Sequence, residues 1–146
     1  MESAVSTSYP VYRCRLPAEG MVETNLRPGE EYRRGSEVVR VTTPRLPCFK
    51  LAAKFCRDRI VRFLRSGFSS CYFSVAEQGT VSPGDLITLL KGEQDRVTIT
   101  ELNQLYVAHA PGLDLLRRAV PVAALPESWR QRFLSKPASV SSPRAI

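Results

Sequence analysis

The stretch EVVRVTTPRLPCFKLAAKF (residues 37–55) contains the change of periodicity on which the fold prediction depends. Its β-branched residues predict a strand over 37–42, which Pro44 closes because proline has no N–H to donate to a β-ladder. From 49 to 55 the two-residue period is lost, and the sequence instead predicts a short helix. A strand-to-helix connection that carries Cys48 is therefore expected near the middle of the chain.

The flanking sequence alternates short strands with turns. Strands are expected at 31–33, 71–75 and 86–90, separated by turns rich in glycine and proline. A second inserted helix is expected to start at an Asp58 cap and to end at Gly67 in the left-handed conformation. This spacing predicts a mixed α+β fold, in which a partial antiparallel β-barrel or sandwich carries two inserted helices.

The chain changes character after Gly92. Thr98-x-x-Glu101 has the spacing of a capping box, with Val97 and Leu102 at the flanking staple positions. Apolar residues at three- and four-residue spacing predict two further helices, the last of which opens at Pro126. We therefore expect a lead-in over 1–19, the sheet portion over 20–92, a three-helix unit over 95–136 and a flexible tail over 137–146.

The bulk properties are those of a globular protein with a basic surface. The chain has 146 residues, is 43% hydrophobic and carries a net charge of +7. No apolar run reaches the roughly 20 residues needed to cross a bilayer, and the N-terminus does not have the pattern of a secretory signal, so we expect a cytoplasmic protein. The positive charge favours anionic partners. Basic residues occur along the whole chain without a dense run, so a solvated basic surface is the alternative.

The cysteines differ in their surroundings. Cys14, Cys48, Cys56 and Cys71 form no Cys-x-x-Cys pair, and the single histidine is His109, so the spacing predicts neither a structural zinc site nor a disulfide framework. We expect Cys56 and Cys71 to be small buried hydrophobic residues.

Cys48 is the strongest candidate for a functional residue. Arg45, Lys50 and Lys54 lie within six residues of it, and two prolines stiffen its loop. Nearby cations and an adjoining helix N-terminus both favour a thiolate. The residues alone leave open a nucleophile, a redox thiol, a soft metal ligand and simple packing.

The segment Pro44-Arg45-x-Pro47-Cys48-x-Lys50-Leu51 closely resembles the cysteine loop of MOSC domains, the fold named after the C-terminal domain of molybdenum-cofactor sulfurase. The similarity is greatest to the bacterial YiiM-type branch, and it covers roughly residues 19–135. It continues through the stretches VRFLRSG (61–67), VTITELN (97–103) and LPESWR (125–130). The last two stretches resemble the three-helix extension of that branch.

The resemblance implies a β-barrel that binds a molybdenum-pterin cofactor (molybdopterin), with Cys48 as the sulfur ligand to the metal. It implies an oxidoreductase that reduces N-hydroxylated compounds, such as N-hydroxylated purine bases, with electrons from a separate flavoprotein reductase. Arg45 and Lys50 would hold anionic groups of the cofactor or tune the thiolate, although Lys50 could instead be a solvated first-turn residue. Pyridoxal phosphate is a further cofactor to consider.

This sequence departs from the family pattern at its N-terminal side. The His-Gly-Gly and Gly-Glu-Asn motifs of typical members have no counterpart before Gly20. We therefore expect a half barrel with exposed edges, which could complete itself as a homodimer or could have lost catalysis and serve to contact a partner. A basic nucleic-acid-binding protein is a further alternative, with phosphate contacts from Arg117, Arg118, Arg130 and Arg132.

Overall fold

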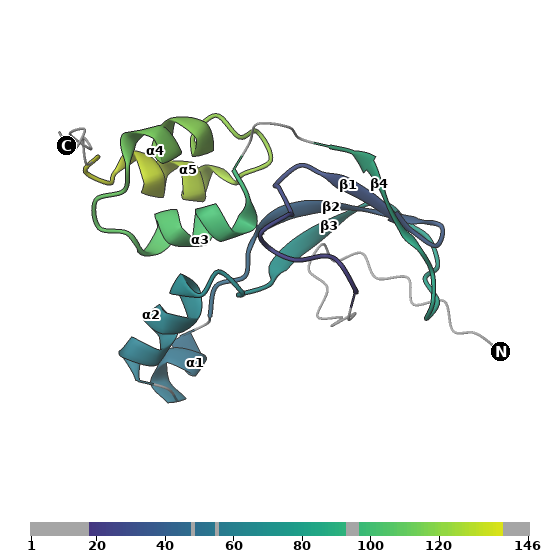
Figure 1. Ribbon diagram of the computed structural model, residues 1–146, viewed down its shortest axis with the longest axis horizontal. Coiled ribbons are helices and arrows are strands. Elements are labelled where there is room, and N and C mark those ends of the chain that lie inside the picture. Colours follow the sequence, from purple (N-terminus) through teal and green to yellow (C-terminus); the bar gives the residue numbers. More distant parts are fainter. Residues whose placement is uncertain (1–17, 48, 55, 93–96, 139–146) are drawn as a thin grey trace, which may run out of the picture.

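The computed structural model describes residues 18–47, 49–54, 56–92 and 97–138. Its strands are β1 (Glu31–Arg34), β2 (Glu37–Pro44), β3 (Cys71–Glu77) and β4 (Ile87–Lys91). They form one antiparallel sheet in the order β3-β2-β1-β4 (Figure 1). This confirms the mixed fold with an antiparallel sheet. The sheet is not closed in the described part of the chain, and β3 and β4 are its edges.

The link from β3 to β4 crosses the tight turn between β1 and β2. Ser36 N–H donates to the Thr80 carbonyl at 3.1 Å, and Thr80 N–H donates to Ser36 Oγ at 2.8 Å. A Cβ on Gly79 would lie 2.4 Å from backbone atoms of Ser36 and Glu37. Glycine therefore permits the backbones to approach closely at this crossing.

The end of β2 differs from the prediction. Pro44 lies within β2, opposite Cys71 of β3, rather than ending the strand at 42. A register shift between Val41 and Pro44 accompanies this pairing. An irregular pairing at the end of a strand tolerates a residue without an N–H, because proline is accepted at bulges.

Two helices follow β2, α1 (Phe49–Lys54) and α2 (Arg57–Arg65), as the sequence predicted. Asp58 is not the cap of α2, because the helix begins two residues earlier than predicted: the carbonyl of Cys56 already accepts from the N–H of Arg59. Cys56 is also exposed rather than buried, since its N-cap position faces solvent. Gly67 ends the helix with a φ of 78°, as expected.

The remaining helices are α3 (Ile99–Val107), α4 (Leu113–Ala119) and α5 (Glu127–Leu134). The Thr98–Glu101 capping box is present in both directions. These helices bury the main core against one end of the sheet, with Leu102, Leu105 and Phe133 fully inaccessible to solvent. In Figure 1 they lie beside the sheet, whereas α1 and α2 project away from it. No helix in the described ranges is long and apolar enough to span a membrane.

Candidate functional site

The cysteine loop joins β2 to α1. Cys48 itself lies outside the described residues, but both sides of the loop are placed. On one side, Arg45 N–H donates to the Ser70 carbonyl at 2.9 Å, next to the pairing of Pro44 with Cys71. On the other side, α1 begins directly after Cys48. The N-terminal end of the cysteine loop (its root) is therefore hydrogen-bonded to the residues that lead into β3.

The Ser69–Ser70 turn connects this root to two distant segments. Ser70 has a positive φ of 67°, which is unusual for a residue other than glycine. Its N–H donates to Glu23 Oε1 at 2.8 Å. The buried hydroxyl of Ser69 accepts a 2.7 Å hydrogen bond from Asn103 Nδ2, on α3. Hydrogen bonds thus run from the three-helix unit through this turn to the cysteine loop.

Neither Glu23 nor Asn103 was predicted from the sequence to be a site residue, although Asn103 lies in the stretch VTITELN (97–103) that resembles the family. The sequence contains one indication for Asn103, because it is a polar residue directly after the apolar Leu102. In the structure Asn103 is fully buried on α3. A buried amide needs a partner, since leaving it unpaired costs free energy. The sequence could not identify that partner as Ser69, which lies 34 residues away.

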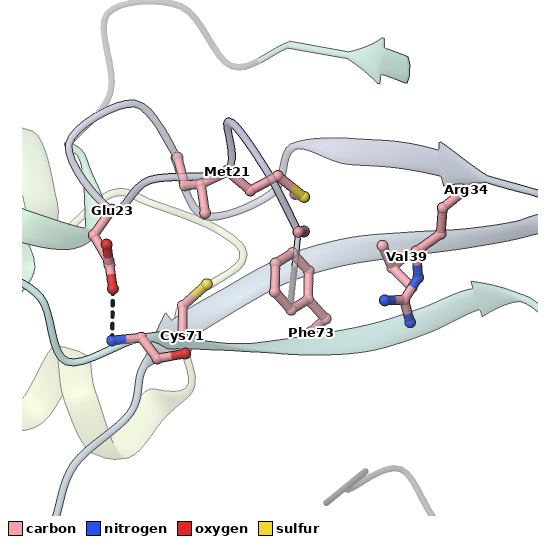
Figure 2. A pocket seen from close by; sticks show the side chains of 9 residues that line it. Met21, Glu23, Arg34, Val39, Cys71 and Phe73 are labelled. Carbon is pink, nitrogen blue, oxygen red and sulfur yellow. Dashed lines mark hydrogen bonds between the residues drawn. The ribbon is translucent and has the colours of Figure 1, made fainter. Parts of the chain in front are cut away.

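A pocket of about 230 Å³ opens beside the same turn (Figure 2). Its walls are mainly apolar, and the charged residues Glu23 and Arg34 lie toward its opposite ends in Figure 2. Glu23 faces the Ser70 N–H, whereas Arg34 forms an ion pair of 2.9 Å with Glu37. The complete lining is Ala18, Met21, Glu23, Leu26, Arg34, Val39, Ser70, Cys71 and Phe73.

Cys71 is a thiol rather than a thiolate at neutral pH. Burial and, to a lesser extent, the carboxylate of Glu23 together raise the pKa of Cys71 to about 12. A group in this state is a poor ligand for a soft metal, because the thiolate is the coordinating form. Cys71 is therefore best described as part of the pocket wall, half-buried as the sequence analysis broadly expected.

Arg45 and Lys50 have charges that no other described residue neutralises. Both side chains are exposed. The ion pairs found in the described ranges involve other residues. The two predicted cofactor-binding residues therefore lie one on each side of the cysteine loop, with their cationic ends available to an anion.

These residues fit a molybdenum-pterin group better than a metal ion held by the protein alone. No group of three or more His, Cys, Asp or Glu side chains suited to a metal occurs among the described residues. A metal that brings most of its ligands on a pterin needs one soft donor from the protein, and Cys48 would be that donor. The unpaired cations beside it would suit the negative charge of such a group.

Comparisons with known proteins agree with this description. The pattern of the MOSC domain matches residues 7–88, and that of the YiiM-like, 3-alpha helix domain matches residues 97–136. The uncharacterized protein YflK of Bacillus subtilis is 35% identical over 122 residues, which are 83% of this chain and 55% of YflK. A protein of Gibberella moniliformis described as "Reductase" is 30% identical over 107 residues, which are 72% of this chain and 19% of that protein.

The fold is also shared with a solved structure. The crystal structure of YiiM from Geobacillus stearothermophilus superimposes with a TM-score of 0.67 at 29% sequence identity. The match covers 79% of this chain and 60% of that chain. The chain thus spans only a little over half the length of YflK and of this YiiM.

Proposed function

Because the chain belongs to the MOSC domain family, we propose that it binds a molybdenum-pterin cofactor through the Cys48 thiolate and reduces N-hydroxylated compounds. N-hydroxylated purine bases are the substrate class that we propose. The observation that carries this proposal is the cysteine loop, which has cations on both sides and a root hydrogen-bonded beside an apolar pocket.

The residues of the chain would divide the work. Cys48 would supply the soft sulfur donor, while Arg45 and Lys50 would bind anionic groups of the cofactor. The apolar walls of the pocket, such as Met21 and Phe73, would exclude water and pack against a flat substrate or the pterin. Pyridoxal phosphate stays a prediction from the resemblance, for which the described residues offer no more than the exposed amine of Lys50.

The reaction itself is a two-electron reduction. An N–OH group takes up two electrons and two protons, becomes N–H and releases its oxygen as water. The bound cofactor would supply the change of oxidation state and accept the oxygen, while the protein provides binding and electrostatics.

The electrons would come from a separate flavoprotein. The region similar to this chain makes up 19% of the Gibberella protein described as "Reductase", so four fifths of that protein have no counterpart here. If that protein carries its electron supply in the same chain, the present protein would need a partner in trans. This partner is part of the proposal.

Metal analysis tests the cysteine assignment. The wild type, Cys48→Ser and Cys56→Ser should be purified from a host that makes the cofactor, and molybdenum measured by mass spectrometry. Cys56→Ser is the matched control, because Cys56 is an exposed cysteine at the start of the arginine-rich helix α2. We expect about one molybdenum per chain in the wild type and the control, and at least a tenfold loss in Cys48→Ser.

Two results would contradict the proposal. Molybdenum absent from the wild type would favour a cofactor-free relative that contacts a partner, consistent with the open sheet of the described residues. A molybdenum content in Cys48→Ser equal to that of the wild type would show that another residue is the metal ligand. Turnover of an N-hydroxylated purine with reduced methyl viologen as the electron donor tests the reductase activity separately.

A further inference from the structure

Nearly all the net charge of the protein lies in one segment, which projects from the sheet. Residues 45–65 contain seven basic residues and one acidic residue, which gives this segment +6 of the whole-chain charge of +7. In the rest of the chain, basic and acidic residues nearly cancel. Basic residues occur along the whole chain, but outside this segment acidic residues offset their charge.

The projection consists of α1, α2 and the loop before them, and we call it the basic arm. Figure 1 shows α1 and α2 extending away from the sheet, with α2 in contact with α3. Its seven cations are all exposed: Arg45, Lys50, Lys54, Arg57, Arg59, Arg62 and Arg65. The cations of the basic arm are thus all accessible to solvent.

Four arginines in the rest of the molecule behave differently. Arg34, Arg40, Arg118 and Arg130 each form an ion pair within 3.3 Å of a carboxylate. None of the seven cations of the basic arm has an ion pair with a described residue. Like charges held together without counter-charges repel one another, so this arrangement disfavours the free protein and favours a bound anionic surface.

Exposed aromatic side chains lie on and beside the basic arm. Phe63 of α2 is 43% exposed, Phe68 is 61% exposed and Tyr72, at the start of β3, is 42% exposed. Arginine and aromatic residues together are enriched at protein–protein interfaces, where they supply most of the binding energy. This combination favours a protein partner over a lipid surface, since α2 has only nine residues and four of them are arginines.

We propose that the basic arm is the docking surface for an acidic redox protein that delivers electrons to the site at Cys48. The inference rests on the proposed function. Cys48 lies within the basic arm in sequence, between Arg45 and Lys50. A donor docked on the arm would therefore be held close to the metal ligand. The remainder of the molecule is near neutral in net charge, so the basic arm carries most of the positive charge that such a partner would meet.

Charge reversal on the basic arm tests this proposal. Arg59→Glu with Arg62→Glu changes two exposed residues of α2 that have no role in the cofactor site. The matched control is Arg33→Glu with Arg117→Glu, which makes the same change of net charge at exposed positions of β1 and α4. The probe is a bacterial flavodoxin, a small acidic flavoprotein, titrated against each protein at 50 mM and 200 mM salt.

We expect the arm variant to bind flavodoxin about tenfold more weakly at low salt, the control to bind like the wild type, and 200 mM salt to reduce the difference. Equal losses in both variants, or no binding by the wild type, would overturn the proposal. Stronger arm-dependent binding to a 20-base-pair DNA duplex or to phosphatidylserine vesicles would also overturn it, and would identify a nucleic acid or a membrane as the partner.

Turnover separates this proposal from the proposed function. In the cofactor-loaded protein, the arm variant should lose activity with reduced flavodoxin and keep it with reduced methyl viologen, which needs no docking surface. If viologen drives no turnover in the wild type, the reductase function is wrong, while the binding comparison still decides whether the basic arm recognises an acidic protein. If both donors lose activity equally in the arm variant, the docking proposal is wrong.

Discussion

The three-helix unit and the basic arm are both helical, yet they follow opposite principles. Helices α3–α5 bury Leu102, Leu105 and Phe133 completely, and Arg118 and Arg130 in this unit are paired with carboxylates. Helix α2 buries only Leu64 and leaves its arginines unpaired. The first region is organised for stability. The second keeps its charge available for recognition, and changes in the two regions should therefore have different consequences.

The largest stability effect should come from truncating the core of the three-helix unit. Phe133→Ala removes a fully buried ring that packs on Trp129, at 5.7 Å between ring centroids. We expect the free energy of unfolding to fall by about 3–5 kcal/mol, because such a cavity cannot fully collapse. Urea unfolding followed by circular dichroism measures it. Phe63→Ala on the basic arm is the control, and a similar loss there would refute the contrast.

The next effect concerns the hydrogen bonds that join the two regions. Asn103→Ala removes the donor to Ser69 within a buried site, and we expect a loss of about 1–3 kcal/mol. It should also change the rate at which iodoacetamide modifies Cys48, because the Ser69–Ser70 turn holds the root of the cysteine loop. Gln104→Ala, an exposed neighbour on α3, should change neither quantity. An unchanged Cys48 rate in Asn103→Ala would show that the turn does not hold the loop.

A smaller effect should follow from removing the cap of α3. The hydroxyl of Thr98 accepts from Glu101 N–H at 3.2 Å, and Thr98 N–H donates to the Glu101 carboxylate at 2.8 Å. Thr98→Ala should cost about 1 kcal/mol in thermal or chemical unfolding. Thr98→Ser keeps the hydroxyl and should recover most of the loss. Equal losses in the two variants would mean that the methyl group matters more than the cap.

The smallest effect should appear as a pH dependence. Partial burial raises the pKa of Glu101, but the Thr98 N–H and the Arg118 guanidinium outweigh it, so the pKa lies below its ordinary value of 4.5. The stabilisation is therefore complete above pH 4.5 and is lost as the pH falls through the lowered pKa. Arg118→Gln should reduce this acid-dependent loss, by less than about 1 kcal/mol because the pair is partly exposed. Unfolding curves of the wild type and the variant at pH 7 and pH 3.5 measure this loss. If the loss is the same in both proteins, the Glu101–Arg118 pair does not contribute to it.

The sequence predicted the features that depend on neighbouring residues. The Thr98–Glu101 box, the glycine at the end of α2 and the strand-to-helix change around Cys48 all lie within a few residues of their causes. The predicted start of α2 was wrong because cysteine is an uncommon capping residue. Cys56 occupies the N-cap without a capping hydrogen bond from its side chain. The prediction that Cys56 is buried was wrong, because the average burial of cysteine says little about a residue at the end of a helix.

The features that the sequence could not predict join distant segments. Glu23 reaches Ser70 across 47 residues, and Asn103 reaches Ser69 across 34. No local pattern encodes such pairs, because the intervening chain must fold before they meet. The strand order could not be predicted for the same reason. The position of β4 beside β1 depends on the link from β3, which crosses the turn between β1 and β2. The candidate site was therefore identified by its loop but not by what holds the loop.

That crossing has a consequence for how the protein folds. The β1–β2 hairpin needs only a short turn to close, whereas the bonds between Ser36 and Thr80 join residues 44 positions apart. Closing a longer loop loses more chain entropy, so the hairpin should be present before β4 arrives. During synthesis, the hairpin and the cysteine loop leave the ribosome well before Thr80. The nascent chain thus exposes Cys48 for a period in which the sheet that anchors it is still incomplete.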